Sequence, residues 1–100
     1  MAMQVVWSLK ARDDRKAILH YWRIRNESNT YSKILNKLFK DSIQIIEGFP
    51  HIGKATNDPN TRIKTVRDYL IFYEETETQI FILTIWDSRQ DPDKLEKVLG

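Results

Sequence analysis

Residues 61–89, TRIKTVRDYLIFYEETETQIFILTIWDSR, decide the fold of this 100-residue chain. The stretch contains three runs of β-branched and aromatic residues, which suit the pleated, half-buried surface of a sheet: residues 62–66, 69–74 and 79–86. The connections between the runs are residues 67–68 and 75–78. Because a parallel pair needs a long crossover, connections this short predict three consecutive antiparallel strands.

Two helices are predicted before these strands. Ser8 is a good N-cap because its hydroxyl can accept a hydrogen bond from a first-turn amide, and the helix after it reads LKARDDRKAILHYWRIRN. A second helix is expected over residues 30–47, where apolar residues recur at helical spacing. Gly48 is expected to end it, and Pro50 prevents its restart. The polar link NESN between the two predicts an antiparallel helical hairpin.

The remaining segments complete one predicted domain over residues 1–100. Gln4–Trp7 is a short β-rich run, residues 49–60 form a loop that contains two prolines, and Asp91-Pro92 can start a short C-terminal helical turn. The predicted order is therefore β-α-α-β-β-β. This order indicates an α+β fold in which a small antiparallel sheet packs on the N-terminal helical hairpin.

The last strand is apolar on both of its faces. Strict alternation divides it into two sets, which are Ile80, Ile82, Thr84 and Trp86 on one face and Phe81, Leu83 and Ile85 on the other. A sheet covered by helices on one face should instead alternate apolar with polar residues. Two interpretations follow: the second face is wrapped by the chain's own loops, or it binds a partner.

Basic residues border the strand block. Arg62 and Lys64 share one face of the first strand by alternation, Arg67 lies in the adjoining turn, and Arg89 follows the last strand. These cations fit a solvated basic edge strand, which opposes edge-to-edge association. They also fit an anion site if they converge.

Composition narrows the function classes. The chain has no cysteine, so disulfides and zinc–thiolate sites are excluded. No apolar window is long enough to span a membrane, and no signal peptide is recognisable, so a cytoplasmic protein without a membrane partner is expected. There is no glycine-rich phosphate loop, and His20 and His51 lack a ligand pattern, so we expect neither a metal nor a cofactor. The net charge of +2 permits a nucleic-acid partner without predicting one.

Three segments together resemble the RelE/ParE toxin superfamily: VVWSLKARDDRKAILHYW, IIEGFPHIGK and VRDYLIFYEETETQIFILTIWDSRQDPDKL. The resemblance extends over residues 4–95, nearly the whole chain. It implies the toxin of a bacterial type II toxin–antitoxin module. A cognate antitoxin would hold the toxin inactive in a hetero-oligomer, with a helix and an extended segment wrapped over its exposed surface.

Members of this superfamily share a fold but differ in their targets. ParE-like members inhibit DNA gyrase, whereas RelE-like members cut messenger RNA in the ribosomal A site with lysines and arginines that stabilise the scissile phosphate. The resemblance implies two sets of site residues here. Arg62, Lys64 and Arg89 would be catalytic if the chain is a metal-independent endoribonuclease, and the expected contacts to RNA or another target are Lys54, Arg67 and Trp86.

Two departures from the RelE-like pattern favour the ParE-like subgroup. Leu70 stands where an arginine is expected, and Leu95 stands near the place of a late tyrosine or histidine, so the obvious acid–base group is missing. The strand YLIFY also looks like the ParE version. A ParE-like gyrase inhibitor that acts by binding is therefore expected. The alternatives are a RelE-like ribosome-dependent endonuclease and a degenerate member that only binds antitoxin.

Overall fold

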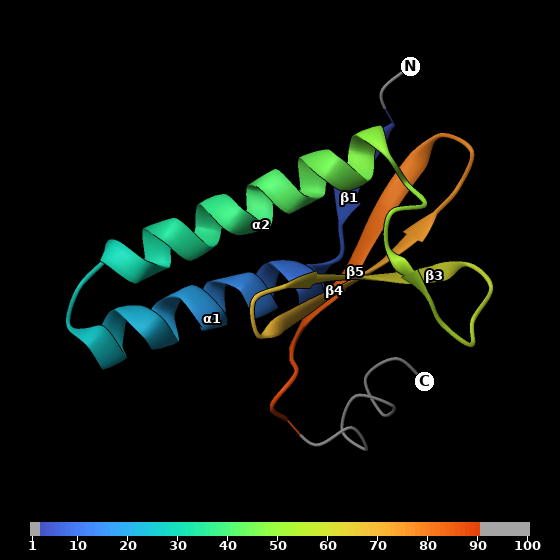
Figure 1. Cartoon of the computed structure of the whole chain (residues 1–100). Coiled ribbons are helices and arrows are strands. Elements are labelled where there is room, and N and C mark those ends of the chain that lie inside the picture. Colours follow the sequence, from blue (N-terminus) through green and yellow to red (C-terminus); the bar gives the residue numbers. More distant parts are fainter. Residues whose placement is uncertain (1–2, 91–100) are drawn as a thin grey trace.

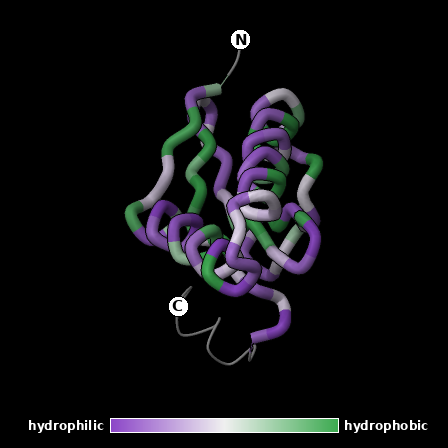
Figure 2. Tube along the Cα trace, turned by 90° about the vertical axis from the view of Figure 1, so that its left-hand side faces the viewer, coloured by the Kyte–Doolittle hydropathy of each residue, from purple (hydrophilic) through white to green (hydrophobic). Residues whose placement is uncertain are grey.

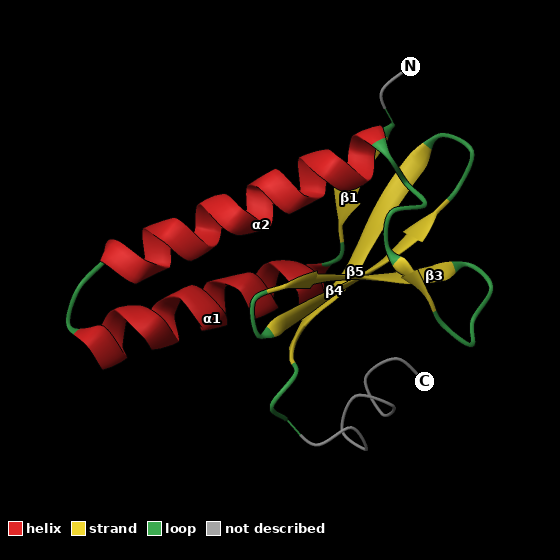
Figure 3. Ribbon diagram, viewed as in Figure 1, coloured by secondary structure: helices red, strands yellow, loops and turns green. Residues whose placement is uncertain are grey.

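The computed structural model describes residues 3–90 and has an α+β fold, as predicted (Figures 1 and 3). Along the chain the elements are β1 (Gln4–Trp7), α1 (Leu9–Asn26), α2 (Thr30–Gly48), β2 (Lys54–Ala55), β3 (Thr61–Val66), β4 (Tyr69–Glu75) and β5 (Gln79–Asp87). The two-residue strand β2 lies inside the stretch predicted to be a loop. The predicted order β-α-α-β-β-β therefore omitted this strand. The expected C-terminal turn lies outside the described residues.

The five strands form one sheet in the order β1-β5-β4-β3-β2. The strands β3, β4 and β5 are consecutive antiparallel neighbours, as their short connections predicted. The first strand differs, because β1 pairs with β5 in parallel, from Gln4 opposite Gln79 to Trp7 opposite Ile82. The sheet is therefore mostly antiparallel, which agrees with the predicted fold, and the direction of its first strand had not been predicted. The helical hairpin after β1 supplies the long crossover that a parallel pair requires.

The ends of the helices follow from local hydrogen bonds. The Ser8 hydroxyl accepts from the Ala11 amide at 2.9 Å, which confirms the predicted N-cap of α1. The same hydroxyl donates to the Leu83 carbonyl at 2.8 Å and so fastens the start of α1 to β5. The helix α2 continues through Gly48, because the Phe49 amide closes the last turn on the Ile45 carbonyl at 2.8 Å. Gly48 is thus the last residue of α2, one residue beyond the expected bound at residue 47.

The core lies between the helical hairpin and one face of the sheet (Figure 1). Both helices show hydrophobic and hydrophilic positions in alternation, as amphipathic packing requires (Figure 2). The largest fully buried side chains of the helices and the sheet meet in this layer: Leu35, Phe39, Ile46, Ile71, Tyr73, Ile80 and Ile82. Among the described residues, no helix is long and apolar enough to cross a membrane.

A β-bulge in β5 changes which residues face the core. Tyr73 pairs with Ile82 and Phe72 pairs with Thr84, so Leu83 has no partner on β4. One extra residue reverses the alternation beyond it, and Ile85 therefore joins the core face while Trp86 leaves it. The predicted assignment of faces was correct before the bulge and wrong after it.

The face of the sheet opposite the helices is also apolar. The register places Leu70 opposite Trp86 and Phe72 opposite Thr84 on this face. Phe72 is 3% exposed and Trp86 9% exposed, whereas Leu70 and Phe81 are half-buried. The central strands β4 and β5 therefore carry apolar side chains on both faces.

Candidate functional site

The predicted cations of β3 lie against the rest of the protein. Arg62 and Lys64 share one face of the strand, and Arg62 is opposite Tyr73, whose side chain is in the core. The Arg62 guanidinium donates to the backbone carbonyls of Gly53 at 2.9 Å and His51 at 3.4 Å. Arg62 therefore holds the segment after α2 in place, a role that its position in the sequence did not reveal.

The three predicted target contacts lie in different places. Lys54 is exposed on the edge strand β2. Arg67 is exposed in the two-residue turn between β3 and β4, where its φ of 54° is left-handed. Trp86 lies opposite Leu70 on the face away from the helices. The register therefore distributes these residues over an edge, a turn and a face.

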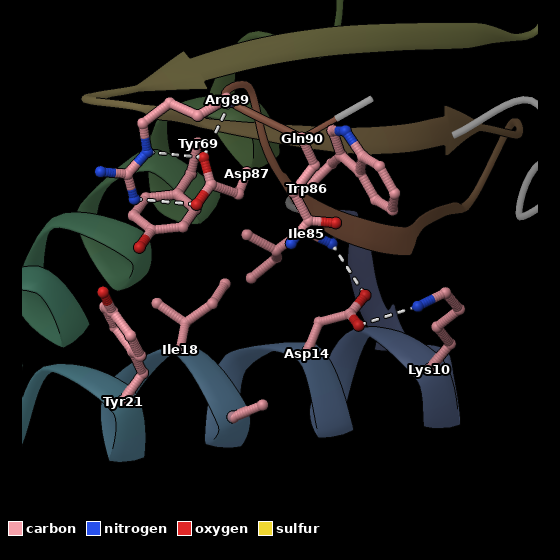
Figure 4. Close-up of a pocket in the computed structure, with 11 residues that line it drawn as sticks. Lys10, Asp14, Ile18, Tyr21, Tyr69, Ile85, Trp86, Asp87, Arg89 and Gln90 are labelled. Atoms are coloured by element: carbon pink, nitrogen blue, oxygen red, sulfur yellow. Dashed lines mark hydrogen bonds and ion pairs between the residues drawn. The ribbon is translucent and has the colours of Figure 1, made fainter. Parts of the chain in front are cut away.

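Arg89 is paired within its own segment. Its guanidinium donates to both carboxylate oxygens of Asp87, at 2.9 and 2.8 Å, in the bidentate geometry that gives strong ion pairs (Figure 4). Asp87 is opposite Tyr69, whereas Arg62 is opposite Tyr73. Four residues of β4 separate these positions, which is about 13 Å along the strand. The fold thus brings Arg62 and Lys64 together but places Arg89 at the other end of β4.

The Asp87–Arg89 pair predicts a pH-dependent stability. Hydrogen bonds from Arg89 hold the pKa of Asp87 below its usual value, so folding favours the ionised carboxylate. This stabilisation is complete above about pH 4, the usual aspartate pKa, and is lost as pH falls through the folded pKa. We expect Arg89→Gln to lower Tm at pH 7 and to lower it less at pH 2.5, as measured by circular dichroism. A Tm difference that is the same at both pH values would contradict this account.

A groove lies between α1 and the end of β5 (Figure 4). It encloses about 540 Å³ and is open to solvent. Asp14 and Tyr21 rise from α1 on one side, whereas Trp86 and Arg89 come from the end of β5 and the residues after it. A second hollow continues along α1 and shares Ala17 and Tyr21 with the first. Together they form one continuous surface, the α1 groove.

One face of α1 lines this groove along its whole length, and we call this face the floor. Lys10, Asp14, Ala17, Tyr21 and Ile24 recur at spacings of four and three residues, which places them on one helical face. Tyr21 is 50% exposed and Ile24 63% exposed, so the far half of this face is an apolar surface in solvent. The stripe from Lys10 to Ile24 is about 21 Å long at 1.5 Å per residue.

Asp14 links α1 to β5 across the groove. Its carboxylate accepts hydrogen bonds from the Thr84 hydroxyl and, at 3.2 Å, from the Ile85 amide, and it also accepts one from Lys10 Nζ at 2.8 Å. The Thr84 side chain is fully buried. The sequence does not predict this contact, because nothing in it distinguishes Asp14 from the neighbouring Asp13. Only the position of β5 beside α1 shows which of the two carboxylates reaches the strand.

A second link joins α1 to the sheet through aromatic side chains. Trp22 Nε1 donates to the Tyr69 hydroxyl at 2.7 Å, and the Trp22 ring packs edge-to-face on Tyr31 with centroids 4.9 Å apart. Burial raises the pKa of Tyr69. The Arg89 guanidinium lies 5.9 Å from the Trp22 ring centroid. The start of β4, which pairs with the end of β5, is thus fixed against α1 at this point.

The segment after α2 is fixed by Tyr73. The Tyr73 hydroxyl accepts from the Gly53 amide at 2.9 Å and donates to the Pro50 carbonyl at 2.7 Å. A Cβ atom on Gly53 would lie 2.5 Å from that hydroxyl, so this close approach requires glycine. Burial raises the pKa of Tyr73, which keeps its hydroxyl protonated and able to donate. Within residues 3–90, no group of three or more His, Cys, Asp or Glu side chains is placed to hold a metal ion.

A helical hairpin packed on a small, mostly antiparallel sheet is the fold that the RelE/ParE resemblance implied. Residues 5–92 match the family model described as ParE toxin of the type II toxin–antitoxin system parDE. The chain therefore belongs to the ParE toxin family and is the toxin component of a type II toxin–antitoxin system. Membership in this family implies a cognate antitoxin as a partner.

A solved structure agrees with this assignment of the fold. The chain is similar to a chain of the structure titled "Chromosomal ParDE TA system from P. aeruginosa", with a TM-score of 0.73 and 17% identity. The match covers 84% of this chain and 94% of the other. At that identity the likeness concerns the fold alone. No curated protein matches the sequence.

Proposed function

We propose that this ParE-family toxin stops growth by binding DNA gyrase, and that it does not cut RNA. The observation that carries the proposal is the engagement of the arginines expected at an RNase site. Arg62 donates to the carbonyls of His51 and Gly53, and Arg89 is bidentate on Asp87. Cations committed to internal acceptors are poorly placed to bind a scissile phosphate.

The chemistry of RNA cleavage gives a second argument. A metal-independent nuclease needs cations aimed at the phosphate as its charge develops, together with a group that moves a proton. Leu70 lies beside Trp86 in the register, where the RelE-like pattern has an arginine, and a leucine can do neither task. A toxin without this chemistry acts by binding a target, and gyrase is the target of ParE-like members.

The α1 groove is the surface that we assign to the antitoxin. Its length of about 21 Å suits a helix of about four turns, and its apolar floor at Ala17, Tyr21 and Ile24 suits an amphipathic helix. Lys10 and Arg89 are ion-paired with the two carboxylates of the groove, Asp14 and Asp87, so these four charges balance and Arg25 adds one cation. The occupant is therefore an amphipathic helix that packs its apolar side on this floor.

Controlled expression in bacteria tests the proposed target. After induction without antitoxin, we expect growth to stop and plasmid DNA to relax, as seen on chloroquine gels, while primer extension on translated messages shows no new cuts. Co-expression of the antitoxin is the control and should restore both growth and supercoiling. New cuts within codons on normally supercoiled DNA would instead identify a RelE-like endonuclease, and unimpaired growth would identify a degenerate member.

A further inference from the structure

The helix α2 carries a second stripe of side chains beside the one that faces the core. Its members are Ile34, Leu38, Asp41 and Ile45, separated by four, three and four residues. Leu38 also packs against the core, whereas Ile34 is 46% exposed and Ile45 is 41% exposed. Alternating steps of four and three residues are typical of the seam along which one helix packs on another helix. We call these four residues the α2 seam.

The α2 seam lies on the side of α2 that is turned away from α1. Ser32 marks the side next to α1, because its hydroxyl donates to the Leu19 carbonyl at 2.7 Å. At 3.6 residues per turn, Ile34 follows Ser32 by about 200° around the helix axis, and Ile45 follows it by about 220°. The α1 groove is instead lined by α1, by Tyr69 and by residues 85–90 (Figure 1). The two surfaces are therefore separate.

The apolar members of the α2 seam are complementary to a second copy of the same helix. When two identical helices pack antiparallel about a twofold axis, residues at equal distances on either side of that axis meet. Ile34 and Ile45 are equally far from the point between residues 39 and 40, and so are Leu38 and Asp41. One register therefore places Ile34 of each copy on Ile45 of the other.

Charge favours the same register. Within one chain, Lys37 Nζ lies 3.0 Å from Asp41 Oδ2, and the two side chains are 77% and 48% exposed. The antiparallel register places Leu38 beside Asp41 of the other copy, so the neighbouring Lys37 also comes beside that carboxylate. A charged residue within a seam favours the register that gives it a partner. A second copy satisfies the apolar and the charged pairing at once, which selects it over a partner of unrelated sequence.

We propose that the α2 seam is a self-association surface, through which two copies of this toxin pack antiparallel along α2. The contact extends over about 17 Å between Ile34 and Ile45, at 1.5 Å per residue. A contact between single helices is small, below the roughly 1,200 Å² of standard interfaces, so the dimer is weak and reversible. It leaves the α1 groove open, so each copy can bind an antitoxin. The inference is independent of the toxin's target.

Reversing one charge tests the contact. In sedimentation equilibrium of the purified full-length toxin, the average mass should rise with concentration from that of one chain towards that of two. Lys37→Glu gathers four carboxylates at the twofold axis, and Asp41→Lys gathers four lysines there. Each variant should weaken the dimer at least about tenfold, because like charges repel across an interface. Lys16→Glu, the same charge change on exposed α1, is the matched control and should weaken it less than about twofold.

Combining the two reversals tests the identity of the partner. The variant Lys37→Glu/Asp41→Lys restores opposite charges across the axis and should dimerise within about threefold of the wild type. An equimolar mixture of the two single variants should form a mixed dimer, although neither variant dimerises well alone. This pattern requires that the partner is a second copy of the chain.

Three results would overturn the proposal. The first is a wild-type toxin that stays monomeric at every concentration. The second is a dimer that persists unchanged in Lys37→Glu and Asp41→Lys while both keep the wild-type circular dichroism spectrum, because the contact would then lie elsewhere. The third is a loss of antitoxin affinity or of gyrase inhibition in these variants with unchanged dimerisation, which would assign the α2 seam to that other partner.

Discussion

Replacing Asp14 with alanine should lower the free energy of unfolding by about 2–4 kcal/mol. One carboxylate oxygen of Asp14 accepts from both the Thr84 hydroxyl and the Ile85 amide. The Thr84 side chain is fully buried, so its hydroxyl would lose its partner in a place that water does not reach. The Lys10 side chain is 45% exposed, so solvent screens its ion pair with Asp14 and the pair contributes little of the effect. Urea denaturation followed by tryptophan fluorescence measures the change.

Asp13 provides the matched control for this substitution. It is the neighbouring aspartate on the same helix, and its side chain is exposed. Asp13→Ala should change stability by less than about 0.5 kcal/mol, as exposed substitutions usually do. Asp14→Asn keeps one acceptor oxygen and should fall between the two. Equal stability of Asp14→Ala and Asp13→Ala would show that the junction between α1 and β5 does not depend on this carboxylate.

Substituting Ala17 with glutamate should weaken antitoxin binding by about 100-fold or more, a loss typical of a disrupted interface centre. Ala17 lies where the two parts of the α1 groove meet, and its side chain is short and exposed. A glutamate there fills the floor of the groove and places a charge within the apolar surface on which the helix packs. Isothermal titration calorimetry with the purified antitoxin measures the loss, and gyrase inhibition by the free variant should remain.

Lys16→Glu controls for the added negative charge. Lys16 is exposed on α1 and does not line the groove. Its substitution should weaken antitoxin binding less than about fivefold, through long-range charge alone. The assignment of the groove to the antitoxin would be wrong if both variants lost the same affinity, or if Ala17→Glu lost none.

The sequence predicted most of the fold because its patterns are local. The alternation and short connections of residues 61–89 predicted β3, β4 and β5, and helical spacing after Ser8 and Thr30 predicted both helices. The misses have non-local causes. The strand β2 has only two residues, too few to show an alternating pattern of apolar and polar side chains. The direction of β1 relative to β5 depends on the path of the chain through the helical hairpin between them. The bulge at Leu83 exists only in the pairing of β5 with β4.

The site was less predictable than the fold. Sequence position indicated that Arg62 and Lys64 share a face, which the register bears out. It could not indicate that the Arg62 guanidinium would meet the carbonyls of His51 and Gly53, since that depends on how the loop returns over β3. The only sequence signal for the contact between Tyr73 and Gly53 is the glycine itself, three residues after Pro50. Its partner Tyr73 is 20 residues further along the chain, so the sequence alone does not connect the two. Catalytic roles for Arg62, Lys64 and Arg89 stay predictions of the RNase alternative.

The most direct test of the central claim is a supercoiling assay with purified components. Purified toxin is titrated against DNA gyrase and relaxed plasmid, with and without the antitoxin, and the supercoiled product is measured on agarose gels. The account predicts inhibition that saturates with toxin and is reversed by stoichiometric antitoxin, in the absence of ribosomes or RNA. Full gyrase activity at every toxin excess, with cleavage of messenger RNA on translating ribosomes, would contradict it.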